Sequence, residues 1–319
     1  MPVPLTIRTE DLSKTFGRGS KSVPAVKHLN LEVEAGQVYG FLGPNGAGKT
    51  TTIRMLMDLI RPSGGKAEIY GRNVRTPGVL ARVGALVEGP AFYGYLSGWN
   101  NLEVLARTAN GYNPGRIQAL LEQVGLAARA RQPVGSYSLG MKQRLGIAAA
   151  LLGDPDLVIL DEPTNGLDPA GIQEMRGFIR SLAKDRDKTV FLSSHLLNEV
   201  EQVCDRVAII HKGEMIREGP VAGLLAESSS KLWVQVSPVE KAEGLLKDRW
   251  KVSRESLPPE PDPWLVVRVP SEDSPEVVEF LVAHGIQVRQ VVARRQTLEE
   301  YFLAATRETS VGDSEVTHD

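Results

Sequence analysis

A short glycine-rich segment constrains the fold of this chain more than any other feature of its sequence. The segment fits the pattern G-x-x-x-x-G-K-[ST], and its residues are Gly43, Pro44, Asn45, Gly46, Ala47, Gly48, Lys49 and Thr50. An apolar run precedes it, and the residues from Thr51 onward read as a helix. In this setting, successive backbone N–H groups and the helix N-terminus point at one anion. The segment therefore predicts a loop that binds nucleotide phosphates, with Lys49 at the β- and γ-phosphates and the Thr50 hydroxyl on Mg²⁺.

The size and charge of the chain narrow its class. With 319 residues, the chain is long enough for roughly two domains. Lysine plus arginine (37) nearly balances aspartate plus glutamate (39), so there is no general electrostatic attraction to nucleic acid or to an anionic membrane. The one cysteine, Cys204, excludes an intramolecular disulfide and fits a reducing compartment. The N-terminus does not read as a signal peptide, and no apolar stretch approaches the ~18–20 residues that span a bilayer, so a membrane function would need another chain.

Apolar runs that alternate with helical patterns indicate an α/β fold. Residues 157–160 and 189–192 read as strands that are covered on both faces, and a helical pattern begins between them at Pro169. We therefore expect a mainly parallel, doubly wound sheet, which a hairpin over residues 207–217 closes. The residues from about 90 to 150 read as a helical subdomain beside this sheet.

The order of elements changes in the last third of the chain. A short polar linker ends near residue 230, so we expect a first domain over residues 1–227 and a second over residues 231–306. The second domain reads as strand, helix, two strands, helix and strand, an order that suggests a small α+β, ferredoxin-like fold. The tail, residues 309–319, is polar, and we expect it to be disordered.

Two acidic residues follow the apolar strand over residues 157–160. Asp161 and Glu162 would lie at the C-terminal edge of a parallel sheet, where α/β folds bind ligands. Asp161 would hold Mg²⁺, and Glu162 would polarise the attacking water as a general base, which contributes roughly 10²–10⁴-fold to a rate. Ordinary solvated acids at a strand end would be the preferred interpretation if the chain had no phosphate loop.

A second helix start offers another place for an anion. Ser138 and Gly140 begin a helix that continues to Leu152, and they present a hydroxyl and free backbone N–H groups. An ordinary helix cap explains this segment by itself equally well. His195 follows the last core strand and can contact a γ-phosphate, although a lone histidine is more often structural. Asp168 ends a tight turn just after the two acids.

Together these segments resemble the ATP-binding subunit of ABC transporters. The resemblance covers residues 5–225 approximately and rests on five motifs in order: the phosphate loop, residues 137–144, residues 160–164, residues 166–169 and Ser194-His195. The chain is similar in particular to the subfamily that exports drugs and peptide antibiotics, including bacitracin and lantibiotic self-protection transporters. The resemblance implies the ABC type of P-loop NTPase fold, with an antiparallel β subdomain and a helical subdomain, plus a C-terminal accessory domain.

The resemblance also implies how the site works and where the protein acts. ATP and Mg²⁺ would lie between the phosphate loop of one subunit and the Ser138–Gly140 helix start of a second copy, in a head-to-tail homodimer. Lys49, Glu162 and His195 would be catalytic, Thr51 and Asp168 would contact the nucleotide, and Phe16 would stack on adenine, a contact worth roughly 1–3 kcal/mol in base-binding sites. The protein would be cytoplasmic, docked at the cytoplasmic face of the cell membrane on a separate multi-span permease. The aromatic loop over residues 92–95 and the helical subdomain would be the contact surface.

This chain departs from the family pattern in two places. The family has a signature motif at the position of residues 137–141, which usually reads Leu-Ser-Gly-Gly-Gln. Here Tyr137, Leu139 and Met141 replace three of its members, whereas Ser138 and Gly140, which would contact phosphate, are kept. Glu88 stands where the family usually has glutamine near Mg²⁺. It keeps an oxygen ligand but adds a negative charge, so we hypothesise that it slows hydrolysis or makes it depend on contact with the permease.

The alternative is a soluble ABC ATPase that acts as a regulatory, repair or translation factor without a permease. The translation type normally carries two nucleotide domains, and this chain has one phosphate loop. The repair type needs a long coiled-coil insertion, which this sequence lacks, and the near-neutral charge also disfavours nucleic acid as a partner.

Overall fold

A computed structural model gives the fold of the chain. It describes residues 4–89, 91–109, 111–184, 187–227, 231–255, 264–270, 273–294, 297–299 and 302. The chain forms two compact units, Met1–Val221 and Ala222–Asp319. The sequence placed the end of the first domain slightly later, at residue 227. The tail over residues 309–319, which we expected to be disordered, lies outside the described residues.

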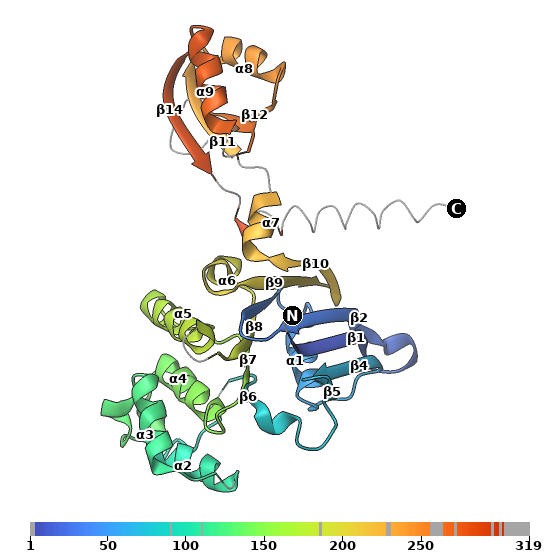
Figure 1. Ribbon diagram of the computed structural model, residues 1–319, viewed down its shortest axis with the longest axis vertical. Coiled ribbons are helices and arrows are strands. Elements are labelled where there is room, and N and C mark those ends of the chain that lie inside the picture. The colour runs from blue at the N-terminus through green and yellow to red at the C-terminus, as the bar shows by residue number, and fades with distance from the viewer. Residues whose placement is uncertain are drawn as a thin grey trace. The chain divides into compact units, whose positions relative to one another are not determined.

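A six-stranded sheet forms the centre of the first unit (Figure 1). In spatial order its strands are β10 (Glu214–Pro220), β9 (Arg206–His211), β3 (Val38–Leu42), β8 (Thr189–Ser194), β7 (Leu157–Asp161) and β6 (Val83–Leu86). All neighbours are parallel except β9 and β10, which form the predicted closing hairpin. Every residue of β3, β7 and β8 is buried, as their apolar sequences predicted.

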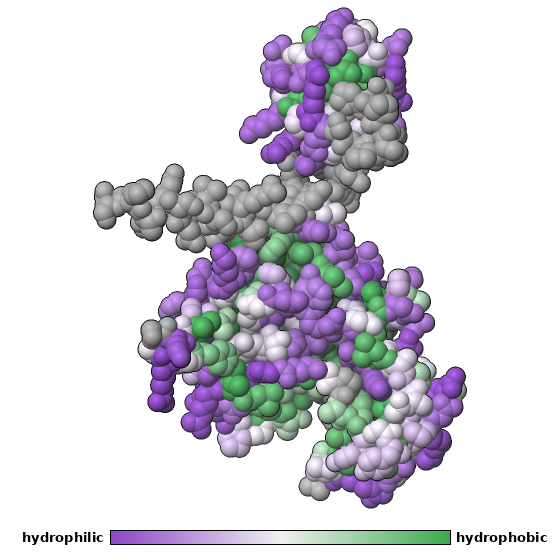
Figure 2. Space-filling model, turned by 180° about the vertical axis from the view of Figure 1, so that it is seen from behind, coloured by the Kyte–Doolittle hydropathy of each residue, from purple (hydrophilic) through white to green (hydrophobic). Residues whose placement is uncertain are grey.

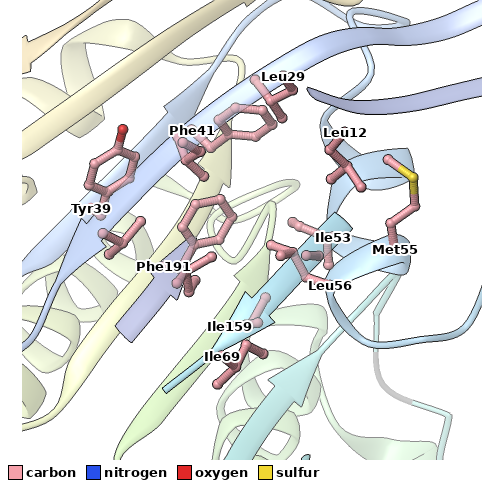
Figure 3. Close-up of a cluster of buried hydrophobic side chains, with 14 of the residues drawn as sticks. Leu12, Leu29, Tyr39, Phe41, Ile53, Met55, Leu56, Ile69, Ile159 and Phe191 are labelled. Carbon is pink, nitrogen blue, oxygen red and sulfur yellow. The ribbon is translucent and has the colours of Figure 1, made fainter. Parts of the chain in front are cut away.

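An antiparallel sheet packs against the first. Its strands are β2 (Val23–Glu34), β1 (Leu5–Phe16), β4 (Gly64–Ile69) and β5 (Arg72–Asn73). Figure 3 shows the core that joins this sheet to β3, β8 and the helix after β3. Phe41 and Phe191 are fully buried there with ring centroids 5.6 Å apart, and Leu29 and Ile53 belong to the same cluster. This core holds the end of β3, and therefore the start of the phosphate loop, in a fixed place.

The helices of the first unit surround the parallel sheet. They are α1 (Lys49–Leu56), α2 (Gly98–Thr108), α3 (Pro114–Gln123), α4 (Leu139–Ala150), α5 (Pro169–Lys184) and α6 (Leu197–Val203). Three of them, α2, α3 and α4, form the predicted helical subdomain, drawn in green in Figure 1. Hydrophilic side chains cover much of the face drawn in Figure 2, and hydrophobic ones gather in patches on this unit. Within the part of the chain that the structure describes, no helix is both long and apolar enough to cross a membrane.

The second unit is a small α+β domain. After α7 (Val221–Glu227), its elements are β11 (Lys231–Ser237), α8 (Val239–Lys247), β12 (Lys251–Glu255), β13 (Trp264–Arg268), α9 (Ser274–Ala283) and β14 (Gln287–Arg294). The strands form one antiparallel sheet in the order β12-β13-β11-β14. Buried side chains of α8 and α9 share one core with the sheet, among them Leu246 and Leu281. The predicted order of elements is confirmed, and the ferredoxin-like assignment stays a prediction.

Candidate functional site

The phosphate loop joins the buried end of β3 to the first turn of α1. Gly46 and Gly48 have left-handed backbones, with φ values of +80° and +109°, which favour glycine. A Cβ atom on Gly43 would lie 2.2 Å from the carbonyl oxygen of Ile210, and one on Gly48 would lie 2.5 Å from that of Ala25. The motif glycines are therefore needed both for the curl of the loop and for the close approach of β2 and β9.

Lys49 lies at the centre of this loop. Its side chain is 5% exposed, and its ammonium group donates hydrogen bonds to the carbonyl oxygens of Gly43, at 2.7 Å, and Pro44, at 3.2 Å. The same nitrogen lies 3.1 Å from Oε1 of Glu162. A buried charge requires partners such as these. The contacts aim the ammonium group at the space between the loop and the end of β7.

Glu162 links Lys49 to His195. Its second carboxylate oxygen, Oε2, lies 2.7 Å from Nδ1 of His195, so a single carboxylate contacts both of these predicted catalytic residues. Glu162 has a left-handed backbone with φ of +50°. Such a conformation costs a non-glycine residue roughly 1–3 kcal/mol and is often found at functional sites. The structure thus brings together the three residues that we predicted to be catalytic.

Ser193 positions both acidic residues, and our sequence analysis missed this role. Its hydroxyl donates a hydrogen bond to Oδ1 of the buried Asp161, at 2.5 Å, and accepts one from the backbone N–H of Glu162, at 3.0 Å. Asp161 and Ser193 are direct partners on β7 and β8. The signal in the sequence was a polar residue at the end of a buried strand, but only the register of the sheet shows which acid it meets.

A cleft of about 290 Å³ opens above these residues. Its lining includes six of the predicted nucleotide contacts, and it consists of Ala25, Asn45, Gly46, Gly48, Lys49, Thr50, Thr51, Glu162, Asn165 and His195. Two of these, Ala25 and Asn165, were not among our predicted site residues. No sequence motif marks Ala25, whereas Asn165 lies in the turn that precedes Asp168. Gly43, Pro44 and Ala47 belong to the loop but lie outside this lining.

Phe16, the predicted adenine platform, lies at the end of β1. Its side chain is 42% exposed, and the Lys14 ammonium nitrogen lies 5.0 Å from its ring centre. Phe16 pairs with Val23 on β2, two residues before Ala25 of the cleft. The ring is therefore accessible for stacking, although Phe16 itself does not line the cleft.

Ser138, Gly140 and Asp168 lie outside the cleft, at two other helix starts. Ser138 caps α4, because its hydroxyl accepts a hydrogen bond from the N–H of Met141 at 3.3 Å. Asp168 does the same for α5, where its carboxylate accepts one from the N–H of Gly171 at 2.9 Å. Both capping residues are exposed to solvent. None of these three residues lines the cleft of its own chain.

Glu88 also lies outside the cleft lining. It follows β6 with a left-handed backbone, φ +64°, and its carboxylate forms an ion pair and hydrogen bond with the guanidinium group of Arg54 on α1. Both side chains are partly exposed. This charge partner was not foreseen from the sequence.

The oxygen donors around the cleft suit Mg²⁺. Thr50 lines the cleft with a hydroxyl group, and Asp161 keeps one carboxylate oxygen, Oδ2, beyond the one that Ser193 binds. Mg²⁺ prefers such oxygen ligands and usually takes the remainder from phosphates and water. Among the described residues, no group of three or more histidine, cysteine, aspartate or glutamate side chains could hold a metal ion.

Two titratable groups near β3 support the sheet rather than the cleft. Tyr39 donates a hydrogen bond to Oε1 of Glu218 at 2.8 Å, and burial, together with that carboxylate, raises the pKa of its hydroxyl. Burial likewise raises the pKa of the Cys204 thiol. A Cβ atom on Gly40 would lie 2.9 Å from that sulfur atom, so the cysteine fills space under β3.

Comparisons with known proteins agree with this geometry. A family model described as "ABC transporter" matches residues 26–165. "Bacitracin transport ATP-binding protein BcrA" of Bacillus licheniformis is 44% identical over 301 residues, covering 93% of this chain and 96% of that protein. "Lantibiotic transport ATP-binding protein SrtF" of Streptococcus pyogenes is 40% identical over 212 residues, covering 66% of this chain and 90% of that protein. Among solved structures, cbiO1 of Clostridium perfringens, described as part of the ABC transporter complex cbiONQ, has a TM-score of 0.62 and 25% identity and covers 70% of this chain and 92% of its own.

Proposed function

This chain belongs to the ATP-binding proteins of the ABC transporter family and is an ATPase, and from that premise we propose that it powers an exporter. Its membrane partner would be a separate multi-span permease, with this chain docked on the cytoplasmic face. The relatives named for bacitracin and lantibiotic transport support a peptide antibiotic as the class of cargo. The same names give no support to the alternative of a soluble regulatory, repair or translation factor.

The observation that carries the ATPase mechanism in this proposal is the series of contacts from Lys49 through Glu162 to His195 at the phosphate loop. The phosphates of ATP would accept hydrogen bonds from the N–H groups of the loop and from the Lys49 ammonium group. Lys49 would then give up its contact with Glu162 and contact the γ-phosphate instead. Glu162 would polarise the attacking water as a general base. His195 would hold the carboxylate and the γ-phosphate in place.

Mg²⁺ is part of this proposal. Thr50 and Asp161 would hold the ion, which, when bound, neutralises charge on the β- and γ-phosphates. Ser193 fixes one oxygen of Asp161 and the backbone of Glu162. These two carboxylates are therefore oriented before the nucleotide arrives, which favours catalysis by preorganisation.

A second copy of the chain would complete the site. Ser138 and Gly140 would contact the γ-phosphate bound by the other subunit, and Asp168 would lie at the same interface. Ser138 and Asp168 are exposed, and all three residues lie away from the cleft of their own chain, which supports this arrangement. ATP binding would then favour the dimer, and hydrolysis would release it.

The aromatic loop beside α2 is the surface that we propose for the permease. Tyr93 and Tyr95 are 55% and 77% exposed, and Val104 and Leu105 on α2 are also exposed. The buried amide of Asn101 accepts a hydrogen bond from the N–H of Tyr93 at 2.9 Å and donates one to its carbonyl oxygen at 3.1 Å. The rings therefore sit on an anchored backbone. Local packing of the helical subdomain, the alternative role, would not need them to face solvent.

Replacing the proposed base tests the mechanism. Glu162→Gln should leave ATP binding intact, lower turnover by roughly 10²–10⁴-fold, and trap a dimer with bound ATP. Phosphate release and gel filtration in ATP and Mg²⁺ measure these effects. Glu68→Gln is a matched control, because Glu68 is 20% exposed and pairs with a lysine, as Glu162 does at 19%. If Glu162→Gln turns over ATP nearly as fast as the unaltered protein, Glu162 is not the general base.

Recovery of the partner tests the transport assignment. Affinity purification of the whole chain from detergent-solubilised membranes should recover a multi-span protein. Tyr93→Ala with Tyr95→Ala should reduce that recovery without changing the ATPase activity of the isolated subunit. If purification yields no membrane protein, the exporter assignment fails, while the ATPase mechanism is tested separately.

A further inference from the structure

Two leucines and two glycines pack together where α4 meets the turn before α5. Leu139 is the first residue of α4, and a Cβ atom on Gly166 would lie 2.6 Å from its Cδ2 atom. Leu167 precedes α5, and a Cβ atom on Gly140 would lie 3.4 Å from its Cδ2 atom. Each leucine thus lies on the glycine of the other segment. We call these four residues the leucine–glycine clasp.

The clasp joins the two helix caps described above. Ser138 immediately precedes Leu139, and Asp168 immediately follows Leu167. Both caps are exposed and lie away from the cleft of their own chain. Contacts between packed side chains carry energetic coupling from one site to another. Movement of one cap is therefore coupled to movement of the other, as long as the leucines stay on the glycines.

Gly166 is the clasp residue at which a side chain larger than that of glycine fits least well. Its backbone is left-handed with φ of +75°, and the space for its side chain is already filled by Leu139. Leu139, in contrast, is 49% exposed, so its contact with Gly166 contributes little to the hydrophobic core. The close fit of a half-exposed leucine over a glycine indicates a positioning role.

We propose that the leucine–glycine clasp sets Ser138 and Asp168 as one unit, so that both reach the ATP bound by a second copy together. This inference rests on the proposed function, because it needs the ATP-bound dimer. Leu139 and Gly166 are then positioning residues for hydrolysis. Misplacement by about 1 Å can cost about 100-fold in rate, so a contact of this kind is sufficient to matter.

A double-variant cycle tests the clasp in the Glu162→Gln parent, where ATP-driven dimerisation is read by gel filtration or light scattering. Gly166→Ala should weaken dimerisation by up to about tenfold, because the new methyl group would displace the Leu139 side chain from its place on the turn. Leu139→Ala should weaken it by a smaller factor. The double variant should behave like Leu139→Ala alone, because the alanine at position 139 removes the Cδ2 atom that meets the new methyl group.

Matched controls separate the clasp from general effects. Gly36→Ala carries the same backbone strain, since Gly36 also has φ of +75°, but a Cβ atom there has no neighbour within 4 Å. Leu105→Ala removes another half-exposed leucine, 42% exposed, from α2. Neither control should change dimerisation. Binding of a fluorescent ATP analogue to the monomer should stay unchanged in all variants, because the phosphate loop is intact.

The outcomes distinguish the clasp from the proposed function. If the Glu162→Gln parent does not dimerise in ATP, the proposed two-copy site is wrong. If the parent dimerises but Gly166→Ala behaves like Gly36→Ala, or if Leu139→Ala and Gly166→Ala add independently, the clasp is overturned and the two-copy site stands.

Discussion

The two proposed halves of the ATP site differ in how the chain holds them. At the phosphate loop, Lys49, Glu162 and His195 contact one another directly, and Lys49 is buried. At the other half, Ser138 and Asp168 are exposed, and each contacts the backbone of its own helix start. The first half is thus organised within one chain, whereas the second presents its groups outward. This contrast is what a site shared between two copies requires.

The largest effect is expected at the buried half. Lys49→Ala removes the ammonium group that Gly43, Pro44 and Glu162 surround, so ATP affinity should fall and turnover should drop by about 10³-fold. Equilibrium binding of ATP and steady-state phosphate release measure the two effects. Lys188→Ala is the matched control, because Lys188 is also buried, and bonds to Asp154 and the carbonyl oxygen of Pro155. That control should lower stability and leave ATP affinity unchanged.

The exposed half should show a different pattern. Ser138→Ala should lower turnover by about 10²-fold while ATP binding to the isolated monomer stays unchanged, because one hydrogen-bond donor to the γ-phosphate is lost. Ser97→Ala is the control. Ser97 caps α2 by the same kind of bond, from the N–H of Asn100 at 3.1 Å, so it matches the loss of a cap. Equal losses of turnover in the two variants would contradict an anion-binding role for Ser138.

The sequence predicted the local elements of the buried half better than the contacts between them. The phosphate loop, β3, β7 and the hairpin of β9 with β10 follow from local patterns, because glycine spacing and apolar runs report local backbone conformation. The contact of Ser193 with Asp161 depends on the register of two strands, which is not visible along the chain. The contact of Ala25 with the loop and that of Arg54 with Glu88 depend on the left-handed backbones of Gly48 and Glu88, which are not visible either. Asp168 was predicted as a nucleotide contact, and its capping bond to Gly171 appeared only in the structure.

A smaller effect is expected beside the cleft, at Glu88. If Arg54 neutralises Glu88, Arg54→Gln should free the carboxylate and lower turnover by about two- to fivefold, the scale of an exposed ion pair. Glu88→Gln should raise the turnover of the isolated subunit by a similar factor and weaken its dependence on the permease. The double variant should match Glu88→Gln, because Arg54 then has no charge to neutralise.

The control for Glu88 is another exposed pair. Arg107→Gln breaks the pair of Arg107 with Glu103 on α2 and should leave ATPase activity unchanged. Should Glu88→Gln change neither turnover nor its coupling to the permease, the regulatory hypothesis for Glu88 is wrong.

The smallest effect concerns an ion pair outside both halves. A hydrogen bond from Lys188 holds the pKa of Asp154 below its ordinary value. A lowered pKa stabilises the folded state above the ordinary pKa, and this stabilisation is lost as the pH falls through the lowered value. Asp154 is 71% exposed and screened by solvent, so Asp154→Asn should reduce the free energy of unfolding by at most about 1 kcal/mol at neutral pH.

Denaturant unfolding measured from neutral to acidic pH tests this last expectation. The difference between Asp154→Asn and the unaltered protein should shrink as the pH falls, while ATP turnover at neutral pH stays the same. A constant difference at all pH values would show that the charge of Asp154 is not its source.

The most direct test of a site shared between two copies is to mix two inactive variants. Lys49→Ala damages the phosphate-loop half, and Ser138→Ala damages the other half. In a head-to-tail dimer of one of each, one site carries both defects and the other carries none. Mixing equal amounts should therefore restore ATP turnover to roughly one quarter of that of the unaltered protein under random pairing. Turnover no higher than the average of the two variants alone would mean that each chain forms its site by itself, and would contradict the account.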